Sequence, residues 1–263
     1  MANEYIEISY WQVGIAALLI LVNGAVSLGL RLGIERRLVV AASRMTIQLL
    51  ILGFVLHWVF ALRRWEAVLG LGVLMTLIAG FSAVGRTDFR YRGIWTNSLV
   101  SVWASAWLVT GLAMLVVVQA QPWYHPQYAV PFLGMILGNT LNGISLGLDR
   151  LGKELESNRP QVEALLTMGA TSWEAAREPI REALRTGLIP IINAMLIAGV
   201  VSLPGMMTGQ LLAGVDPVQA VKYQLVIMFL IAAGTTLGTL AVVVLSYRRL
   251  FNTDHQLIAP PPT

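Results

Sequence analysis

The chain has 263 residues, of which 56% are hydrophobic and only 12% are charged, and its mean hydropathy is +0.69. Soluble domains carry about 25% charged residues, so this composition excludes an ordinary soluble domain and indicates a polytopic membrane protein. Cysteine is absent from the sequence, which excludes a disulfide framework and thiolate metal chemistry. The net charge of +4 is what basic cytoplasmic loops supply, and it does not indicate nucleic-acid binding.

Seven apolar stretches are each long enough to cross a bilayer, which takes about 20 helical residues. We therefore expect an all-α fold: a membrane helix bundle of about seven transmembrane helices forming a single domain over residues 1–263. A charged cytoplasmic segment, about 149–186, precedes the sixth span. The predicted spans are 8–30, 38–62, 65–84, 96–118, 131–148, 187–212 and 218–247.

Basic residues predict the orientation of these spans, because cytoplasmic loops carry an excess of Lys and Arg. If the first basic turn, with Arg31, Arg36 and Arg37, is cytoplasmic, the outside loops keep few basic residues. These are Arg63, Arg64 and Lys222. We therefore expect the N-terminus outside and the C-terminus in the cytoplasm.

The sixth span, 187–212, contains a helix-breaking pair. Pro204 lacks an N–H and clashes with the preceding turn, and Gly205 leaves the break unrestrained. In lipid a freed carbonyl needs cover from protein or a water-filled cavity, and broken helices often mark substrate paths. A translocation path or hinge is therefore one interpretation, and a packing kink is the other. The side chains flanking the pair are Ser202, Met206, Met207, Thr208 and Gln210.

The thioether sulfurs of Met206 and Met207, beside the break, are soft ligands suited to transition metals. Methionine is also a common packing residue of hydrophobic cores. The two residues are therefore only weak metal candidates, and the metal ligands stay unknown. Arg44 and Gln48 lie one turn apart on the second span, where a charge is a candidate functional group unless it snorkels to the cytoplasmic surface. Asn139, Asn142 and Asn193 offer amides that line a path or bond between helices.

Catalysis is not predicted for this chain. The histidines at 57, 125 and 255 have no acid or base near them at helical spacing. Residues 147–153 match the first seven positions of a phosphate-binding loop, but the eighth is Glu154 instead of Ser or Thr. A membrane helix also precedes the match where a strand is required, so nucleotide binding by this chain is not expected.

The charged segment predicts two helices. Pro160 opens the first, which ends at Gly169, and Thr171 with Glu174 forms a capping box for the second. The first helix is expected to expose Val162, Leu165, Leu166 and Met168, as a docking element does. An amphipathic helix lying on the membrane is the alternative.

Glycines four residues apart predict close helix packing, and on the fifth span they would suit a dimer seam. The pairs are Gly134 with Gly138, Gly143 with Gly147, Gly205 with Gly209, and Gly234 with Gly238.

Residues 163–171 resemble the coupling loop of an ABC transporter permease. Residues 201–210, 211–214, Asp216-Pro217 and 222–224 resemble the FetB-type permease family, as does the second span at Arg44, 47–49 and Gly53. That family includes bacterial iron exporters and plant aluminium-tolerance permeases.

The resemblance implies a permease subunit of the bacterial inner membrane, working as a homodimer surrounded by lipid and exporting iron or a similar metal cation. A separate cytoplasmic ATPase subunit would carry ATP and magnesium, with no cofactor in this chain. Its docking residues would be Glu163, Ala164, Leu165, Met168, Gly169 and Ala170. Export of an organic anion or nucleotide sugar, and a scaffold or sensor that transports nothing, are the alternatives.

Overall fold

A computed structural model describes residues 8–62, 64–252 and 256–258, so Arg63 and His255 lie outside the described residues. Within the described part of the chain the regular elements are helices, and the β-type pairing is confined to isolated bridges. Six of these helices are long and apolar enough to cross a membrane. The prediction of an all-α polytopic bundle is therefore confirmed.

The chain divides into two compact units: residues 1–64 with 212–214, and residues 65–211 with 215–263. The first unit is a helical hairpin of α1 (Tyr10–Gly29) and α2 (Glu35–Leu62). Gly33, with φ +69°, lies in the connecting turn. Ser27 Oγ donates a hydrogen bond to Glu35 Oε2 at 2.8 Å across this turn, which ties the end of α1 to the start of α2.

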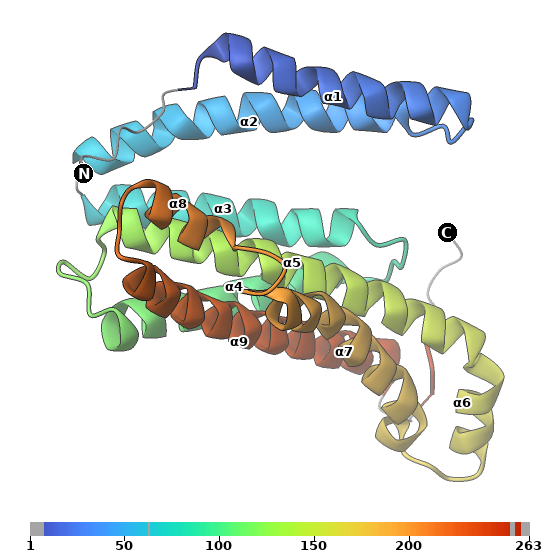
Figure 1. Ribbon diagram of the computed structural model, residues 1–263. Helices are drawn as coiled ribbons and strands as arrows, with labels where there is room; N and C mark the ends of the chain where they lie inside the picture. The colour runs from blue at the N-terminus through green and yellow to red at the C-terminus, as the bar shows by residue number, and fades with distance from the viewer. Residues whose placement is uncertain (1–7, 63, 253–255, 259–263) are drawn as a thin grey trace. The chain divides into compact units, whose positions relative to one another are not determined.

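The second unit contains the remaining helices, apart from the last residue of α8 (Figure 1). The predicted bounds of the third, fourth and seventh spans agree with the structure within a few residues, because each is a plain apolar run. The elements are α3 (Trp65–Gly85), α4 (Ile94–Leu112), the π-helix η1 (Ala113–Val117), α5 (Pro126–Ser157), α6 (Arg159–Thr167), α7 (Ser172–Ile197), α8 (Gly205–Leu212) and α9 (Pro217–Leu250).

Two predicted bounds are wrong. The fifth span was expected to end at residue 148, but α5 continues to Ser157, because Leu151 and Leu155 in its charged extension are buried. The sixth span, 187–212, is not one helix. Its first half belongs to α7, which already begins at Ser172, and its second half is the separate helix α8.

Close glycine contacts establish that α5 and α9 run parallel. A Cβ added at Gly234 would lie 2.7 Å from Ile136, and one added at Gly143 would lie 2.6 Å from Thr239 Oγ1. Residue numbers thus rise together along both helices. The chain must therefore cross back between the end of α5 and the start of α9.

Helix α7 makes that return crossing. A Cβ at Gly143 would lie 3.2 Å from the carbonyl oxygen of Gly187, and one at Gly147 would lie 3.6 Å from that of Ala183. Residue numbers run in opposite directions here, so α7 is antiparallel to α5. It is absent from the six candidate spans because it begins in the charged segment, so the sixth predicted span is not among them, although α7 has the direction that a return crossing requires.

Glycines at the contacts between helices explain how these helices pack closely. Small residues let helix backbones approach in lipid, and four of the predicted glycines do so inside this chain: Gly143, Gly147, Gly234 and Gly238. By contrast, a Cβ at Gly138, Gly205 or Gly209 would meet nothing within 4 Å.

Candidate functional site

The break between α7 and α8 is wider than a proline kink. Helix α7 ends at Ile197 and α8 begins at Gly205. Gly199 adopts φ +81°, a left-handed conformation that favours glycine, and its N–H donates to the carbonyl oxygen of Ser202 at 2.9 Å. The helix therefore stops at Ile197, because Ala198 is already extended (ψ 131°) and Gly199 then turns the chain, before Pro204 is reached. Sequence reasoning missed Gly199, although a glycine just past a helix end is a recognised stop signal.

Pro204 and Gly205 start a helix instead of bending one. The carbonyl oxygen of Pro204 accepts hydrogen bonds from the Thr208 N–H at 3.0 Å and from Thr208 Oγ1 at 3.2 Å. A Cβ at Gly205 would meet nothing within 4 Å, so space does not require glycine there.

The polar and thioether side chains at the break have different surroundings. Ser202 is exposed, whereas Met206, Met207, Thr208 and Gln210 are half-buried. Met206 packs against the hydrophobic core of the second unit, as core-filling methionine does. The buried Oε1 of Gln210 has no hydrogen-bond partner among the described residues, so it is the free polar acceptor at this break.

The asparagines of the fifth span are engaged in different ways. Asn139 Nδ2 donates to the carbonyl oxygen of Met135 within α5 at 2.9 Å, and Asn142 Oδ1 accepts from Arg86 at 2.6 Å. Asn193 is exposed on α7. Because α5 and α7 are antiparallel, Asn139 and Asn193 lie on the same side of the Gly143–Gly187 crossing, towards the break.

Arg44 and Gln48 belong to the other unit. Both are exposed on α2. His57, also on α2, is exposed. Among the described residues, no group of three or more His, Asp or Glu side chains is placed to hold a metal ion.

Helix α6 ends as predicted at Gly169, which adopts φ +92°. The N–H of Gly169 donates to the carbonyl oxygen of Leu166 at 3.1 Å, and the N–H of Ala170 donates to that of Leu165 at 3.0 Å. This pair of bonds is a Schellman motif. It turns the chain sharply between α6 and α7.

The expected exposure of α6 is wrong for most of its apolar residues. Val162 is 2% exposed, and Leu165 and Leu166 are half-buried against the core, because this face packs on the bundle. Met168 alone of the four is strongly exposed, at 75%. An apolar face already covered by protein is not available to a bilayer, which argues against a helix lying on the membrane. The outward surface of the segment contains Glu163, Ala164, Thr167, Met168 and Gly169.

The capping box of α7 is confirmed. Thr171 Oγ1 accepts from the Glu174 N–H at 3.3 Å, and Glu174 Oε2 accepts from the Thr171 N–H at 2.8 Å. The Thr171 N–H and the Thr171 hydroxyl both donate to Glu174 Oε2 at 2.8 Å, and these two hydrogen bonds lower the pKa of Glu174. At α6, by contrast, Asn158 gives no side-chain cap, since its Nδ2 donates to Glu154 Oε2 at 2.7 Å.

One tyrosine, Tyr247, attaches the α6–α7 segment to the rest of the bundle, and sequence reasoning missed this contact. Tyr247 on α9 shares a 2.8 Å hydrogen bond with Ser172 and packs edge-on against Trp173. The only sequence feature that pointed to this contact was an aromatic residue, Tyr247, at the end of an apolar span. An aromatic residue in that position is also typical of a membrane interface. The start of α7 is thereby fixed to the last turns of α9.

A second buried network lies at the end of α9. The Tyr91 hydroxyl is 2.7 Å from Ser246 Oγ and accepts a hydrogen bond from Asn97 Nδ2 at 2.9 Å. Burial raises the pKa of Tyr91, against these hydrogen bonds and the nearby Arg249. The loop between α3 and α4 is thus held at the same end of the bundle as α6.

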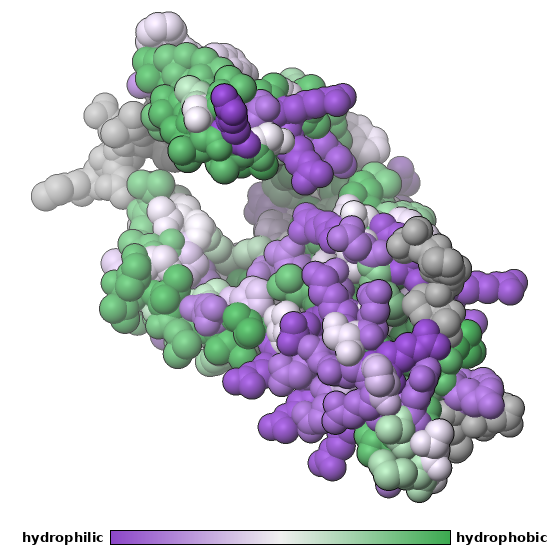
Figure 2. Space-filling model, turned by 90° about the vertical axis from the view of Figure 1, so that its right-hand side faces the viewer, coloured by the Kyte–Doolittle hydropathy of each residue, from purple (hydrophilic) through white to green (hydrophobic). Residues whose placement is uncertain are grey.

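Hydrophilic side chains gather at this end. Figure 2 looks at the molecule from the side on which α6 lies, and hydrophilic residues (purple) dominate this part of the second unit. Ion pairs there include Arg150 with Glu154 at 2.7 Å and Arg159 with Glu163 at 2.8 Å. We call the α6–α7 segment, residues 158–177, the docking segment.

The match to a phosphate-binding loop has a structural explanation. Residues 147–153 are helical throughout. Gly147 packs against Thr239, and Gly152 leaves room for the ring of Phe89. These glycines therefore serve helix packing in α5 and form no phosphate-binding loop.

The family described as Uncharacterised protein family (UPF0014) has a model that matches residues 10–251. The chain belongs to this family. The UPF0014 membrane protein slr1647 of Synechocystis is 39% identical over 98% of this chain and 100% of its own length. The "Probable iron export permease protein FetB" of Escherichia coli is 31% identical over 94% of each chain.

A plant relative also matches most of the chain. The protein ALUMINUM SENSITIVE 3 of Arabidopsis thaliana is 27% identical over 92% of this chain and 87% of its own length. No solved structure matches the chain. The UPF0014 match and the FetB relative confirm the resemblance to the FetB-type family that was inferred from residues 201–224 and the second span.

Proposed function

We propose that this chain is the membrane-spanning permease subunit of an ABC transporter, driven by a separate cytoplasmic ATPase subunit. The docking segment carries the proposal. It is a short helix packed on the bundle by its apolar face, so its other face is free to bind a protein. It is tied to α7 directly and to α9 through Tyr247. Movement at this segment would therefore act on two crossing helices.

The substrate that we propose is iron or a similar metal cation, exported from the cytoplasm. Support comes from the relative in Escherichia coli, whose name describes iron export. The path would follow the α7–α8 break, where Gln210 keeps a free carbonyl oxygen. Because a cation crossing the membrane needs only transient ligands, such a path requires no permanent metal site.

The working assembly would contain two copies of this chain and two ATPase subunits in the bacterial inner membrane. ATP and magnesium would bind on the ATPase subunits. The fifth-span glycines that pack inside this chain are not free for a dimer contact, but Gly138 remains open.

Co-purification with the ATPase subunit tests the docking assignment. Glu163→Lys reverses a charge on the free face of α6, and its exposed pair with Arg159 contributes only about 0.3–0.5 kcal/mol to stability. We expect the variant to fold, but to bind the ATPase about fivefold or more weakly, as loss of an interface anchor does.

Glu178→Lys is the matched control, because Glu178 is an exposed residue of α7 outside the docking segment. It should bind the ATPase normally. Normal binding and transport by Glu163→Lys would refute the docking assignment.

A second candidate substrate is an organic anion or nucleotide sugar, favoured by the exposed guanidinium of Arg44 within a candidate span. A solute screen in liposomes containing both subunits separates the two. Stimulation of ATP hydrolysis by ferrous ion supports metal export, and stimulation by anions alone supports the second candidate. A scaffold or sensor would respond to neither.

A further inference from the structure

A cavity lies at the end of the second unit opposite the docking segment. Its lining comes from the first turns of α3 and α5, the end of α4 with the start of η1, and the loop before α5. Helix α5 runs from this cavity at Ala129 and Val130 to the docking segment after Ser157. The cavity therefore lies where three candidate membrane spans begin or end.

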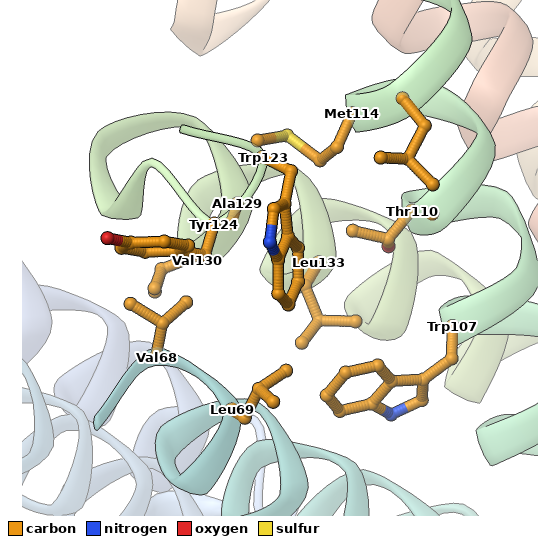
Figure 3. Close-up of a pocket in the computed structure, with 12 residues that line it drawn as sticks. Val68, Leu69, Trp107, Thr110, Met114, Trp123, Tyr124, Ala129, Val130 and Leu133 are labelled. Carbon is orange, nitrogen blue, oxygen red and sulfur yellow. The ribbon is translucent and has the colours of Figure 1, made fainter. Parts of the chain in front are cut away.

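The lining is almost entirely apolar. Figure 3 shows Val68 and Leu69 of α3 facing Trp123 of the loop, with Trp107 of α4 beside them. The indole Nε1 of Trp107 already donates to Thr76 Oγ1 at 3.0 Å. No Asp, Glu, Lys, Arg or His lines the cavity among the described residues. Such a lining suits hydrocarbon and excludes an ion.

One lining hydroxyl has no partner among the described residues. Thr110 is 8% exposed, and its Oγ1 is buried without a hydrogen bond. Helical Thr side chains often bond the carbonyl four residues earlier, as Thr76 does to Gly72 at 2.7 Å. Figure 3 places the Thr110 side chain at the cavity between Met114 and Trp107. An unpaired buried hydroxyl is costly. Helical Thr populates two χ1 rotamers, and rotation about χ1 would turn this hydroxyl towards an acceptor bound in the cavity, which would relieve the cost.

The size and depth of the cavity identify its occupant. Its volume of about 130 Å³ resembles apolar cavities of roughly 150 Å³ that hold a benzene ring, so it accommodates several methylene groups. Trp123 and Tyr124 mark the level of a membrane interface, where such aromatics gather. Glycerolipid esters lie near this level.

We propose that this cavity binds one acyl chain of a glycerolipid, with the Thr110 hydroxyl donating a hydrogen bond to the ester carbonyl oxygen. The site would hold a lipid against α3, α4 and α5 at the end of the bundle away from the ATPase. It is separate from the α7–α8 break and does not depend on the proposed substrate.

The test uses the full chain in nanodiscs containing phosphatidylcholine with a photoactivatable group on one acyl chain. Labelled peptides are located by mass spectrometry. Wild-type label should concentrate on Met114 and Trp107, exceeding that on the lipid-facing Leu108, which is 64% exposed. Label spread evenly over these residues would overturn the proposal.

Gly111→Leu fills the cavity without a clash, because Gly111 lines it and an added Cβ would meet nothing within 4 Å. We expect label on the lining residues to fall about fivefold or more, since a filled site cannot take the chain without overpacking. Gly70→Leu is the matched control, because Gly70 is exposed on α3 with equally open space and does not line the cavity. Unchanged label in Gly111→Leu would overturn the proposal.

Thr110→Val tests the hydrogen bond with nearly unchanged shape. Loss of one hydrogen bond should weaken labelling by the ester probe about threefold to tenfold. A probe with an ether-linked chain lacks the carbonyl, so it should label the wild type and Thr110→Val equally and weakly. Equal labelling of the wild type by ester and ether probes would refute the role of Thr110.

Discussion

At the scale of single residues, backbone conformation at two glycines shapes the segments on which the proposed function depends. Gly169 ends α6 with φ +92°, and Gly199 ends α7 with φ +81°. An L-residue in this region places its Cβ against the following carbonyl oxygen, which costs roughly 1–2 kcal/mol. Neither glycine meets a neighbour within 4 Å at its Cβ position, so conformation and not space requires glycine there.

Gly199→Ala should therefore destabilise the break by roughly 1–2 kcal/mol. We expect a lower apparent melting temperature of the purified chain and reduced transport. Gly205→Ala is the control, because it has equally open surroundings and lies in the helix α8, where alanine is favoured over glycine. Equal melting temperatures for the two variants would contradict the conformational argument.

At the scale of elements, α5 is the helix around which the second unit packs. Its buried residues face α3, α4, α7 and α9 along most of its length. At Gly143 an added Cβ would lie 2.6 Å from Thr239 Oγ1, 2.7 Å from Thr235 Cγ2 and 3.2 Å from the carbonyl oxygen of Gly187. Glycine at this position allows three helix backbones to approach.

Gly143→Ala should cost roughly 1–3 kcal/mol, because overpacking shifts side chains or backbone. Gly138→Ala, one turn away on the same helix, meets nothing within 4 Å and should be neutral or stabilising by up to about 1 kcal/mol. Thermal unfolding of both purified variants measures the difference. A Gly143→Ala chain as stable as wild type would mean that the α5–α7–α9 packing is looser than described.

At the scale of the molecule, the directions of the helices decide which loops share one side of the membrane. Within the second unit α5 and α9 are parallel and α7 is antiparallel to them, as the glycine contacts show. The end with the docking segment also carries the arginines after α3 and at the end of α9, including Arg90 and Arg249. Positive charge favours the cytoplasmic side, so the docking end is expected inside the cell.

Single cysteines test this orientation without background, because the chain has none of its own. A membrane-impermeant maleimide should label Gln121→Cys, in the loop before α5, on intact cells. Ser157→Cys and Asn252→Cys, at the docking end, should be labelled only after the membrane is permeabilised. The opposite pattern would reverse the orientation and refute a cytoplasmic docking segment.

Much of this arrangement is predictable from local sequence. The length of the apolar stretches identifies most of the spans. Helix-capping residues locate the turn at Gly169 and the start of α7 at Thr171. The break in the sixth span was predicted from Pro204, but α7 already ends at Ile197, where an extended Ala198 and a left-handed Gly199 turn the chain. Asn142 illustrates another limit, since its partner Arg86 is 56 residues away in sequence.

Length, hydropathy, caps and motifs are local properties of the chain, so they were enough to predict the membrane class, the all-α fold, the turn between α6 and α7 and the family. Three features could be found only in the folded chain: which glycines lie between packed helices, that the apolar face of α6 is covered by protein, and that Tyr247 joins the start of α7 to α9. The tertiary structure also revealed the cavity at Thr110. These features depend on contacts between residues distant in sequence, which no local pattern encodes.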